Sequence, residues 1–255
     1  MEEILRVENL FLNFGGVQAL SDVSLGINKG EIFSIIGPNG AGKTSLLNSI
    51  SGFYRPQKGT IYFQDVNITK LPSYQRAQRG IARTFQNIEL FKHMTVLDNF
   101  TLGAHVHMKS GILSGSIYWK FAENEELKIR EKIEGIIDFL EIEHIRYQIV
   151  GQLSYGLQKK VELGRALALQ PKIILMDEPM AGMTIEDKED MVRFVIDIND
   201  ERDVTVVLIE HDMGVVMDIS DRVAVLDFGE KIAEGPPHEV RSNENVVKAY
   251  IGEEI

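Results

Sequence analysis

A glycine-rich segment at residues 37–44 carries the residue types that bind a nucleoside triphosphate. It reads Gly-Pro-Asn-Gly-Ala-Gly-Lys-Thr and matches the phosphate-loop pattern G-x-x-x-x-G-K-[ST] in full. Its three glycines let the backbone turn so that several N–H groups face one anion. Lys43 adds a positive charge for the β- and γ-phosphates, and the Thr44 hydroxyl is a ligand that Mg²⁺ accepts. The residues expected to hold the phosphates are Asn39, Gly40, Ala41, Gly42, Lys43, Thr44 and Ser45.

Two carboxylates follow an apolar run further along the chain. Residues 173–176 read Ile-Ile-Leu-Met and are followed at once by Asp177 and Glu178. In a parallel α/β sheet, ligands bind at the carboxyl ends of the strands, where these two side chains are expected to lie. Asp177 can hold a metal ion through water, and Glu178 is placed to act as a base on a water that attacks the γ-phosphate. Alone, the pattern is typical of a strand that ends in a solvated acidic turn; beside a phosphate loop, we favour catalysis.

A third segment could form a second anion site. Residues 153–158 read Leu-Ser-Tyr-Gly-Leu-Gln and begin an apolar helical face formed by Leu157, Val161, Gly164 and Ala168. Ser154 then falls at the N-cap, where its hydroxyl and the free N–H groups of the first turn can bind an anion. By spacing alone, an ordinary capped helix explains this segment better.

The elements that must position these segments alternate between strand and helix. Apolar runs predict strands at residues 4–14, 20–27, 31–36, 59–64, 80–85, 172–176, 204–209 and 222–227. Helical spacing predicts helices at 43–52, 96–105, 123–141, 156–169, 185–199 and 213–219, with a Gly–Ser loop at 110–116. This alternation is typical of a mainly parallel sheet with helices on its faces.

The predicted fold class is therefore α/β, with a P-loop NTPase core and a mainly parallel sheet. We expect an N-terminal antiparallel β portion and an inserted helical subdomain within a single domain of residues 1–255. The core is assigned to residues 1–86 and 170–255, and the helical subdomain to residues 87–169, which include the Leu-Ser-Tyr-Gly segment.

The composition argues against several classes of protein. The chain has 255 residues, of which 25% are charged, and its formal net charge is −11. Such an acidic surface argues against nucleic-acid binding, which depends on Lys and Arg neutralising phosphates. Because the sequence contains no cysteine, disulfides, thiolate nucleophiles and cysteine zinc sites are excluded. No apolar stretch reaches about 18 residues and no secretory signal is visible, so no transmembrane segment is expected.

The order of the three segments is specific. A phosphate loop, a Leu-Ser-x-Gly segment and, 24 residues later, an Asp-Glu-Pro strand end follow one another. This arrangement resembles the nucleotide-binding domain of ABC transporters over nearly the whole chain. The resemblance implies a Mg²⁺-dependent ATP hydrolase that works with integral membrane permease subunits at the cytoplasmic face of the cell membrane. It also implies that Ser154 and Gly156 complete the ATP site of a second ATPase subunit, a copy or a paralogue, in a head-to-tail dimer.

Three further positions match functional residues of that family. Phe14 matches the aromatic residue that stacks on adenine, although a core aromatic at a strand end remains a serious alternative. Gln86, which ends the sequence Arg-Thr-Phe-Gln, matches the glutamine that touches Mg²⁺ and the attacking water. His211, in Ile-Glu-His-Asp, matches the switch histidine at the γ-phosphate. The resemblance thus assigns catalysis to Glu178, His211 and Gln86, and metal binding to Thr44, Gln86 and Asp177.

Two positions depart from the family pattern. Leu157 stands where most members have glutamine, directly after the signature glycine, which puts the geometry of this segment in question. Residues 180–184, Met-Ala-Gly-Met-Thr, occupy a segment that usually ends in Asp or Asn and couples the two ATP sites. Thr184 retains only a hydroxyl there, so coupling between the two sites is also in question.

The C-terminal residues resemble those of ATPase subunits of branched-chain amino-acid importers. The matching segments are residues 232–236, Ile-Ala-Glu-Gly-Pro, and residues 245–253, Asn-Val-Val-Lys-Ala-Tyr-Ile-Gly-Glu. This resemblance predicts import of branched-chain amino acids or a related small polar solute, with an external solute-binding protein in the full system. Without the resemblance, these residues are a common turn followed by an amphipathic helix.

The apolar residues after Gln86 leave two interpretations open. Either they line a groove for a short cytoplasmic helix of a permease, or they form the core of the helical subdomain; they are Ile88, Leu90, Phe91, Met94 and Val96.

Three other functions share parts of this pattern. An ATPase for lipid or polysaccharide export would share every catalytic residue and differ in its membrane partners. A soluble ABC protein of translation or repair usually carries two such domains or a coiled-coil insertion, and neither is visible in this sequence. A regulatory module would bind ATP without turnover, which a phosphate-release assay would detect.

Overall fold

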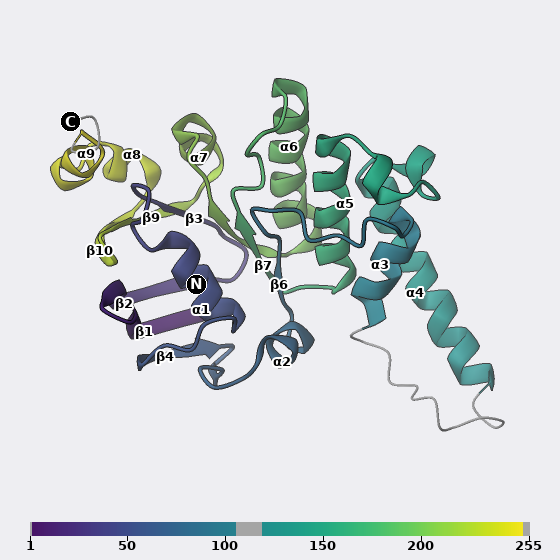
Figure 1. Cartoon of the computed structure of the whole chain (residues 1–255), viewed down its shortest axis with the longest axis horizontal. Coiled ribbons are helices and arrows are strands. Elements are labelled where there is room, and N and C mark those ends of the chain that lie inside the picture. Colours follow the sequence, from purple (N-terminus) through teal and green to yellow (C-terminus); the bar gives the residue numbers. More distant parts are fainter. Residues whose placement is uncertain (1, 106–118, 252–255) are drawn as a thin grey trace.

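The computed structural model describes residues 2–105 and 119–251, and within these ranges two sheets are flanked by helices (Figure 1). The smaller sheet is antiparallel, in the order β2-β1-β4-β5. Its strands are β1 (Glu3–Phe14), β2 (Val17–Asn28), β4 (Lys58–Phe63) and β5 (Val66–Asn67). The larger sheet has the order β10-β9-β3-β8-β7-β6, and only its β10–β9 pair is antiparallel. Its strands are β3 (Ile32–Ile36), β6 (Ile81–Arg83), β7 (Ile173–Asp177), β8 (Thr205–Ile209), β9 (Arg222–Asp227) and β10 (Glu230–Gly235).

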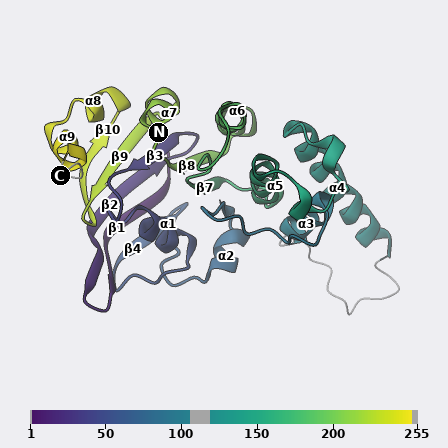
Figure 2. The ribbon, with the colours of Figure 1, turned by 45° about the horizontal axis from the view of Figure 1, so that its top comes forward.

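Helices connect these strands and form the far end of the molecule. In chain order they are α1 (Lys43–Ser51), α2 (Ser73–Gln78), α3 (Val96–Ala104), α4 (Trp119–Phe139), α5 (Tyr155–Ala168), α6 (Ile185–Arg202), α7 (Met213–Ile219), α8 (Pro237–Arg241) and α9 (Glu244–Ile251). Figure 2 shows α3, α4 and α5 gathered at one end, away from α8, α9 and the antiparallel sheet.

Strand β7 separates two cores because alternate side chains point to opposite faces of a sheet. Every residue of β7 is buried, as expected for a parallel strand covered on both faces. Ile173 and Leu175 pack in a cluster with residues of α1 and the antiparallel sheet. Ile174 and Met176 pack in a second cluster with residues of α3, α5 and α6. The carboxyl end of β7, which carries Asp177, therefore lies between the phosphate-loop helix and the helical part of the chain.

The close packing of the helical part depends on a small residue. A Cβ atom at Gly164 of α5 would lie 2.2 Å from the Phe100 ring of α3. Phe100 is fully buried in the cluster that also contains Ile137 and Leu140. Glycine at position 164 thus lets α3 and α5 approach closely, so that α5 is held in a fixed place beside the sheet.

The predicted α/β fold with an antiparallel N-terminal sheet is confirmed, and several local expectations need correction. The strand predicted at 80–85 is only the three-residue β6, because its pairing with β7 ends after Arg83, with one more hydrogen bond from the Thr84 N–H to the Leu175 carbonyl. Residues 232–235, expected as part of a turn, belong to β10, which pairs with β9. The short β5 and α2 have no predicted counterpart. The Gly–Ser loop expected at 110–116 and residues 252–253 of the C-terminal segment lie outside the described residues.

Candidate functional site

The loop between β3 and α1 has a backbone that requires glycine at two positions. Gly37 has φ +144°, and a Cβ there would lie 2.0 Å from the Leu226 carbonyl oxygen. Gly42 has φ +100°, and its Cβ would lie 2.5 Å from the Ala19 carbonyl oxygen. Any side chain at these positions would therefore push the loop out of its turn. The loop leads directly into the first turn of α1, whose free N–H groups can bind an anion.

Lys43 stabilises this loop from inside. Its side chain is nearly buried, at 6% exposure, and its Nζ donates to the carbonyl oxygens of Gly37 at 2.6 Å and Pro38 at 2.8 Å. The ammonium group therefore lies within the curl of the loop, where a phosphate chain would meet it. Thr44, the next residue, is exposed.

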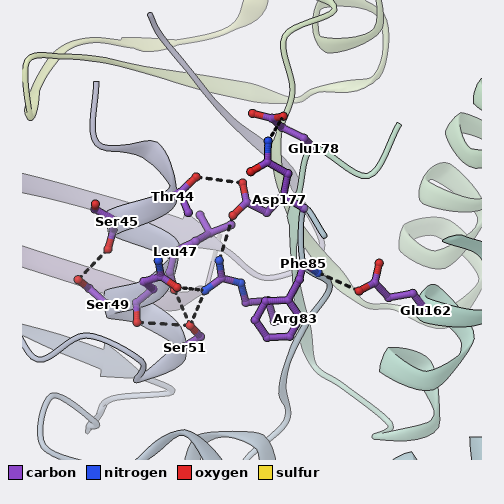
Figure 3. Close-up of polar contacts among 12 residues, drawn as sticks. Thr44, Ser45, Leu47, Ser49, Ser51, Arg83, Phe85, Glu162, Asp177 and Glu178 are labelled. Atoms are coloured by element: carbon purple, nitrogen blue, oxygen red, sulfur yellow. Dashed lines mark hydrogen bonds and ion pairs between the residues drawn. The ribbon is translucent and has the colours of Figure 1, made fainter. Parts of the chain in front are cut away.

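Asp177 lies opposite Thr44 at the carboxyl end of β7 (Figure 3). One carboxylate oxygen, Oδ1, accepts from the Thr44 hydroxyl at 3.3 Å, and the other, Oδ2, accepts from Arg83 Nη2 at 3.0 Å. The side chain is only 1% exposed. Burial raises the pKa of Asp177, and the Arg83 guanidinium opposes this shift.

The three residues expected in catalysis lie together, with Gln86 and His211 both in contact with the Glu178 carboxylate. Gln86 Nε2 donates to Oε2 of Glu178 at 2.8 Å, and His211 Nε2 lies 2.5 Å from Oε1. Glu178 has φ +50°, an unusual conformation for a residue with a side chain. Its N–H donates to the Ile209 carbonyl at 2.9 Å. Gln86 and His211, from two separate segments, thus converge on the carboxylate of Glu178, the residue after Asp177.

Glu210, a residue that was not predicted from the sequence, stabilises the backbone around Glu178 and His211. Its side chain is buried, and it accepts from the N–H groups of Met180 at 3.0 Å and His211 at 3.1 Å. It therefore joins the segment after Glu178 to the segment that carries His211. Burial raises the pKa of Glu210, while the two N–H donors lower it. The only sequence signal for this role is its place between a buried strand and His211.

The donor set next to the phosphate loop fits magnesium. Hydroxyl, carboxylate and amide oxygens are available from Thr44, Asp177 and Gln86, and hard cations prefer such ligands. Among the described residues, no group of three or more His, Cys, Asp or Glu could hold a metal ion by itself. A magnesium ion here would therefore share its coordination with phosphate oxygens, as is usual for this metal.

The Leu-Ser-Tyr-Gly segment is well formed but is not brought to the phosphate loop. Ser154 caps α5 by accepting from the Leu157 N–H at 3.4 Å. The donor in this cap is the backbone N–H of Leu157, so the departure from glutamine leaves the cap intact, and the leucine side chain packs against the helical core. A Cβ at Gly156 would lie 2.4 Å from the Asp187 carboxylate, so a larger residue there would have to displace the Asp187 side chain. In both ribbon views β7 lies between α1 and α5 (Figures 1 and 2), and Figure 1 shows β6 there as well.

Thr184 and Phe14 have clear local positions. Thr184 caps α6 by accepting from the Asp187 N–H at 3.2 Å, and its hydroxyl donates to the Asp187 carboxylate at 2.8 Å. Phe14 lies at the end of β1 with 45% of its surface exposed, edge-on to the Tyr54 ring at 4.9 Å. Phe14 is therefore not a core aromatic residue, which removes the alternative to adenine stacking that the sequence left open.

A groove of about 330 Å³ opens between the sheet core and the helical part. Its walls include Phe53, Tyr74, Arg83, Phe85, Phe91 and Leu102, and we call it the aromatic groove. The apolar residues after Gln86 divide between the two interpretations left open above. Leu90 and Val96 are buried in the helical core, whereas Phe91 is exposed and lines the groove. Met94 is also exposed, and Ile88 packs partly against the core.

No helix among the described residues combines the length and the apolar character needed to cross a membrane.

Comparison with known proteins identifies the family. The sequence profile described as "ABC transporter" matches residues 20–181, and one described as "Branched-chain amino acid ATP-binding cassette transporter" matches residues 230–255. The high-affinity branched-chain amino acid transport ATP-binding protein BraF of Pseudomonas aeruginosa is 37% identical, with 98% of each chain covered. The corresponding protein LivG of Escherichia coli K12 is 37% identical, with 99% of each chain covered.

Solved structures agree with the sequence comparison. The ADP conformation of an ATP-binding cassette of an ABC transporter superimposes with a TM-score of 0.84 at 36% identity, covering 99% of this chain and all of the other. A dimeric post-hydrolysis cassette bound to ADP and phosphate has a TM-score of 0.77 at 28% identity, covering 92% and 99% of the two chains. The chain therefore belongs to the ABC transporter family of ATP-binding cassettes.

Proposed function

We propose that this chain is the ATP-hydrolysing subunit of an ABC importer for branched-chain amino acids or a related small polar solute. The observation that carries the proposal is the convergence of Gln86 and His211 on Glu178, next to Asp177 and the phosphate loop. The match of residues 230–255 to the branched-chain amino acid profile supports the choice of solute.

The roles of the residues follow from their positions. The loop N–H groups and Lys43 hold the phosphates of ATP, and Phe14 offers its exposed ring to the adenine. Thr44, Asp177 and Gln86 supply ligands to magnesium, which neutralises phosphate charge when it is bound. These assignments place the nucleotide site in residues 1–86 and 170–255 and leave residues 87–169 as the helical subdomain.

Glu178 acts as the base in hydrolysis. It accepts a proton from a water molecule as the water oxygen forms a bond to the γ-phosphorus. The bond from the γ-phosphorus to the bridging oxygen breaks, and ADP and phosphate leave. Gln86 and His211 hold the Glu178 carboxylate in place. Each carboxylate oxygen keeps a second lone pair with which to orient the water.

Two copies, or this chain and a paralogue, complete the site in a head-to-tail dimer. Within one chain Ser154 caps α5 and Gly156 lies in its first turn, and α5 lies across β6 and β7 from α1. The Ser154 hydroxyl and the first turn of α5 form an anion site that can cover the γ-phosphate of a partner. A dimeric relative bound to ADP and phosphate supports this arrangement.

The aromatic groove is the proposed docking site for the permease. Its occupant would be a short cytoplasmic helix of an integral membrane subunit, with apolar side chains to cover Phe53, Phe91 and Leu102. This places the chain at the cytoplasmic face of the membrane, with an external solute-binding protein supplying the solute on the other side. The acidic net charge of −11 gives no reason to expect nucleic acid as a partner.

The test is capture of the complete transporter. Tagged Glu178→Gln protein, with ATP and Mg²⁺, is purified from detergent-solubilised native membranes and its partners are identified by mass spectrometry. Recovery of integral membrane subunits of an importer supports the proposal, and transport by the reconstituted complex identifies the solute. Recovery of soluble factors alone, from membranes that contain the protein, contradicts it.

A further inference from the structure

Arg83 lies between the proposed metal site and the aromatic groove. It is the last residue of β6, the edge strand that pairs with β7, and its side chain is 6% exposed. Its guanidinium contacts Asp177, while the same residue forms part of the groove wall. A single buried side chain thus belongs to both sites, and Figure 3 shows it directed toward Asp177.

The polar contacts of Arg83 join two elements of the nucleotide site. Nη2 donates to Asp177 Oδ2 at 3.0 Å. Nη1 donates to Asn48 Oδ1 at 2.6 Å and to Ser51 Oγ at 2.9 Å, both on α1. The planar fork of arginine makes these contacts together, which a lysine cannot do. Asp177 is therefore held in one orientation relative to the helix that follows the phosphate loop.

The guanidinium of Arg83 also makes cation–π contacts with two rings of the groove. Its guanidinium carbon lies 5.8 Å from the centroid of the Phe53 ring and 5.0 Å from that of the Phe85 ring. The two rings meet edge-on at 5.5 Å and both line the aromatic groove. Any segment that packs on Phe53 and Phe85 must therefore displace solvent from these rings and reset the surroundings of the guanidinium.

The hydrogen bonding of Arg83 is incomplete. Its Nε is buried and lacks a hydrogen-bond partner among the described residues. Buried donors are nearly always paired in folded proteins, because an unpaired one is costly, so a shift of the guanidinium that gives Nε a partner would be favourable. A small movement would alter its contact with Asp177, since the carboxylate has Thr44 as its other side-chain partner in the contacts observed.

We propose that Arg83 is a positioning residue that couples the aromatic groove to Asp177, so that a permease segment in the groove and Mg²⁺ at Asp177 affect each other's binding. This inference rests on the proposed function of both sites. Because coupling between two binding sites is reciprocal, Mg²⁺ at Asp177 must change the affinity of the groove for its ligand. We expect this change to act through the contacts of Arg83 with the groove rings, which are made even when no permease is present. The groove rings can therefore report on the metal site in the isolated protein.

The experiment uses the full chain labelled with 4-fluorophenylalanine and followed by ¹⁹F NMR. The chain has 12 phenylalanines, and the resonances of interest are assigned with Phe53→Leu and Phe85→Leu. The protein is saturated with the non-hydrolysed ATP analogue AMP-PNP in EDTA, and Mg²⁺ is then added in excess. We expect the Phe53 and Phe85 resonances to shift in the wild type. We expect Arg83→Gln to lose these shifts while AMP-PNP binding in EDTA is retained.

Two further variants separate coupling from a general effect on folding. Arg83→Lys keeps the positive charge but lacks the planar guanidinium. We expect this variant to fold even if Arg83→Gln does not, and to lose most of the Mg²⁺-induced shift of the Phe53 and Phe85 resonances. Arg76→Lys is the matched control, since Arg76 is also buried beside α1 but donates to the carbonyl oxygens of Ser49, Ile50, Leu71 and Thr69. We expect this control to be destabilised and to keep the Mg²⁺-induced shifts.

The outcomes distinguish this inference from the proposed function. Unchanged Phe53 and Phe85 resonances in wild-type protein that binds AMP-PNP with Mg²⁺ and hydrolyses ATP overturn the role of Arg83 alone. Full shifts in both Arg83 variants do the same. A wild-type protein that neither binds AMP-PNP nor hydrolyses ATP overturns the proposed function, and this inference with it.

Discussion

The buried ammonium group of Lys159 donates to the backbone carbonyl of Gln86 at 2.9 Å. This hydrogen bond connects α5, the helix that begins at the Leu-Ser-Tyr-Gly segment, to the segment that carries the proposed catalytic glutamine. Lys159 also donates to the Phe85 carbonyl at 3.1 Å and pairs with Glu162 at 3.5 Å. Glu162 in turn accepts from the N–H groups of Phe85 and Glu89. The backbone around Gln86 is thus held by one buried ion pair on α5.

Lys159→Met should destabilise the fold and misplace Gln86. Both members of the pair are 2% exposed, and loss of one partner of a buried pair costs about 3–5 kcal/mol because the other charge is left buried. Urea unfolding measures this loss, and we expect kcat for ATP to fall while KM changes little. Lys160→Met is the control, because Lys160 is also buried but its partner Asp190 is half-exposed and stays solvated without it, so the loss should be smaller. Equal destabilisation by both variants would contradict this role.

Glu178→Gln should retain ATP binding and lose most turnover. The amide keeps the shape of the side chain but cannot accept the proton of the attacking water, and removal of a general base lowers rates by about 10²–10⁴-fold. Phosphate release gives the rate, and equilibrium dialysis with ATP gives the affinity. Glu189→Gln, at an exposed position on α6, should leave both unchanged. Near-normal hydrolysis by Glu178→Gln would show that another group is the base.

The sequence predicts the residues whose roles depend on local pattern. Asp177, Glu178 and His211 follow apolar strands, and parallel pairing of those strands brings their carboxyl ends together. Arg83 and Lys159 could not be found in this way. Arg83 meets Asp177 across 94 residues, and Lys159 meets Gln86 across 73.

The short strands could not be predicted from the sequence for a related reason. A three-residue strand such as β6 is defined by its pairing with β7 rather than by any period in its own sequence. The same holds for Glu230–Gly235, where a sequence with little apolar alternation becomes β10 because β9 offers an edge. Patterns within one segment predict the long elements, and contacts between segments decide the rest.

Lys43→Ala should weaken nucleotide binding. Lys43 Nζ is the buried cation inside the curl of the loop, and hydrogen bonds to charged groups contribute about 1.5–3 kcal/mol. We therefore expect ATP affinity to fall about 10–100-fold in equilibrium dialysis. Lys70→Ala removes an exposed lysine and serves as the control for the change in net charge. Unchanged ATP affinity in Lys43→Ala would remove this residue from the site.

Glu210→Gln should change how stability depends on pH. Burial raises the pKa of Glu210 in the folded protein, so the folded state binds this proton more tightly than the unfolded state. Stability linked to this group is then present at low pH and is lost as pH rises from its usual value through the raised one. The difference in unfolding free energy, wild type minus Glu210→Gln, should therefore fall across that window, by at most about 1.4 kcal/mol per pH unit. Urea unfolding at a series of pH values measures it, and a difference that stays constant would refute the linkage.

Leu102→Glu should separate permease docking from ATP binding. Leu102 lies on α3 in the wall of the aromatic groove and is partly exposed, so a carboxylate there stays solvated in the free protein but must lose water when an apolar helix docks. We expect ATP affinity to be unchanged and unfolding free energy to change by about 0.5 kcal/mol or less. Co-purification of membrane subunits from detergent-solubilised membranes should be lost. Leu127→Glu places the same charge on α4 at an exposed position outside the groove and should co-purify normally. Retained membrane subunits in Leu102→Glu would mean that the permease binds elsewhere, because a docked apolar helix leaves this carboxylate without water or a partner.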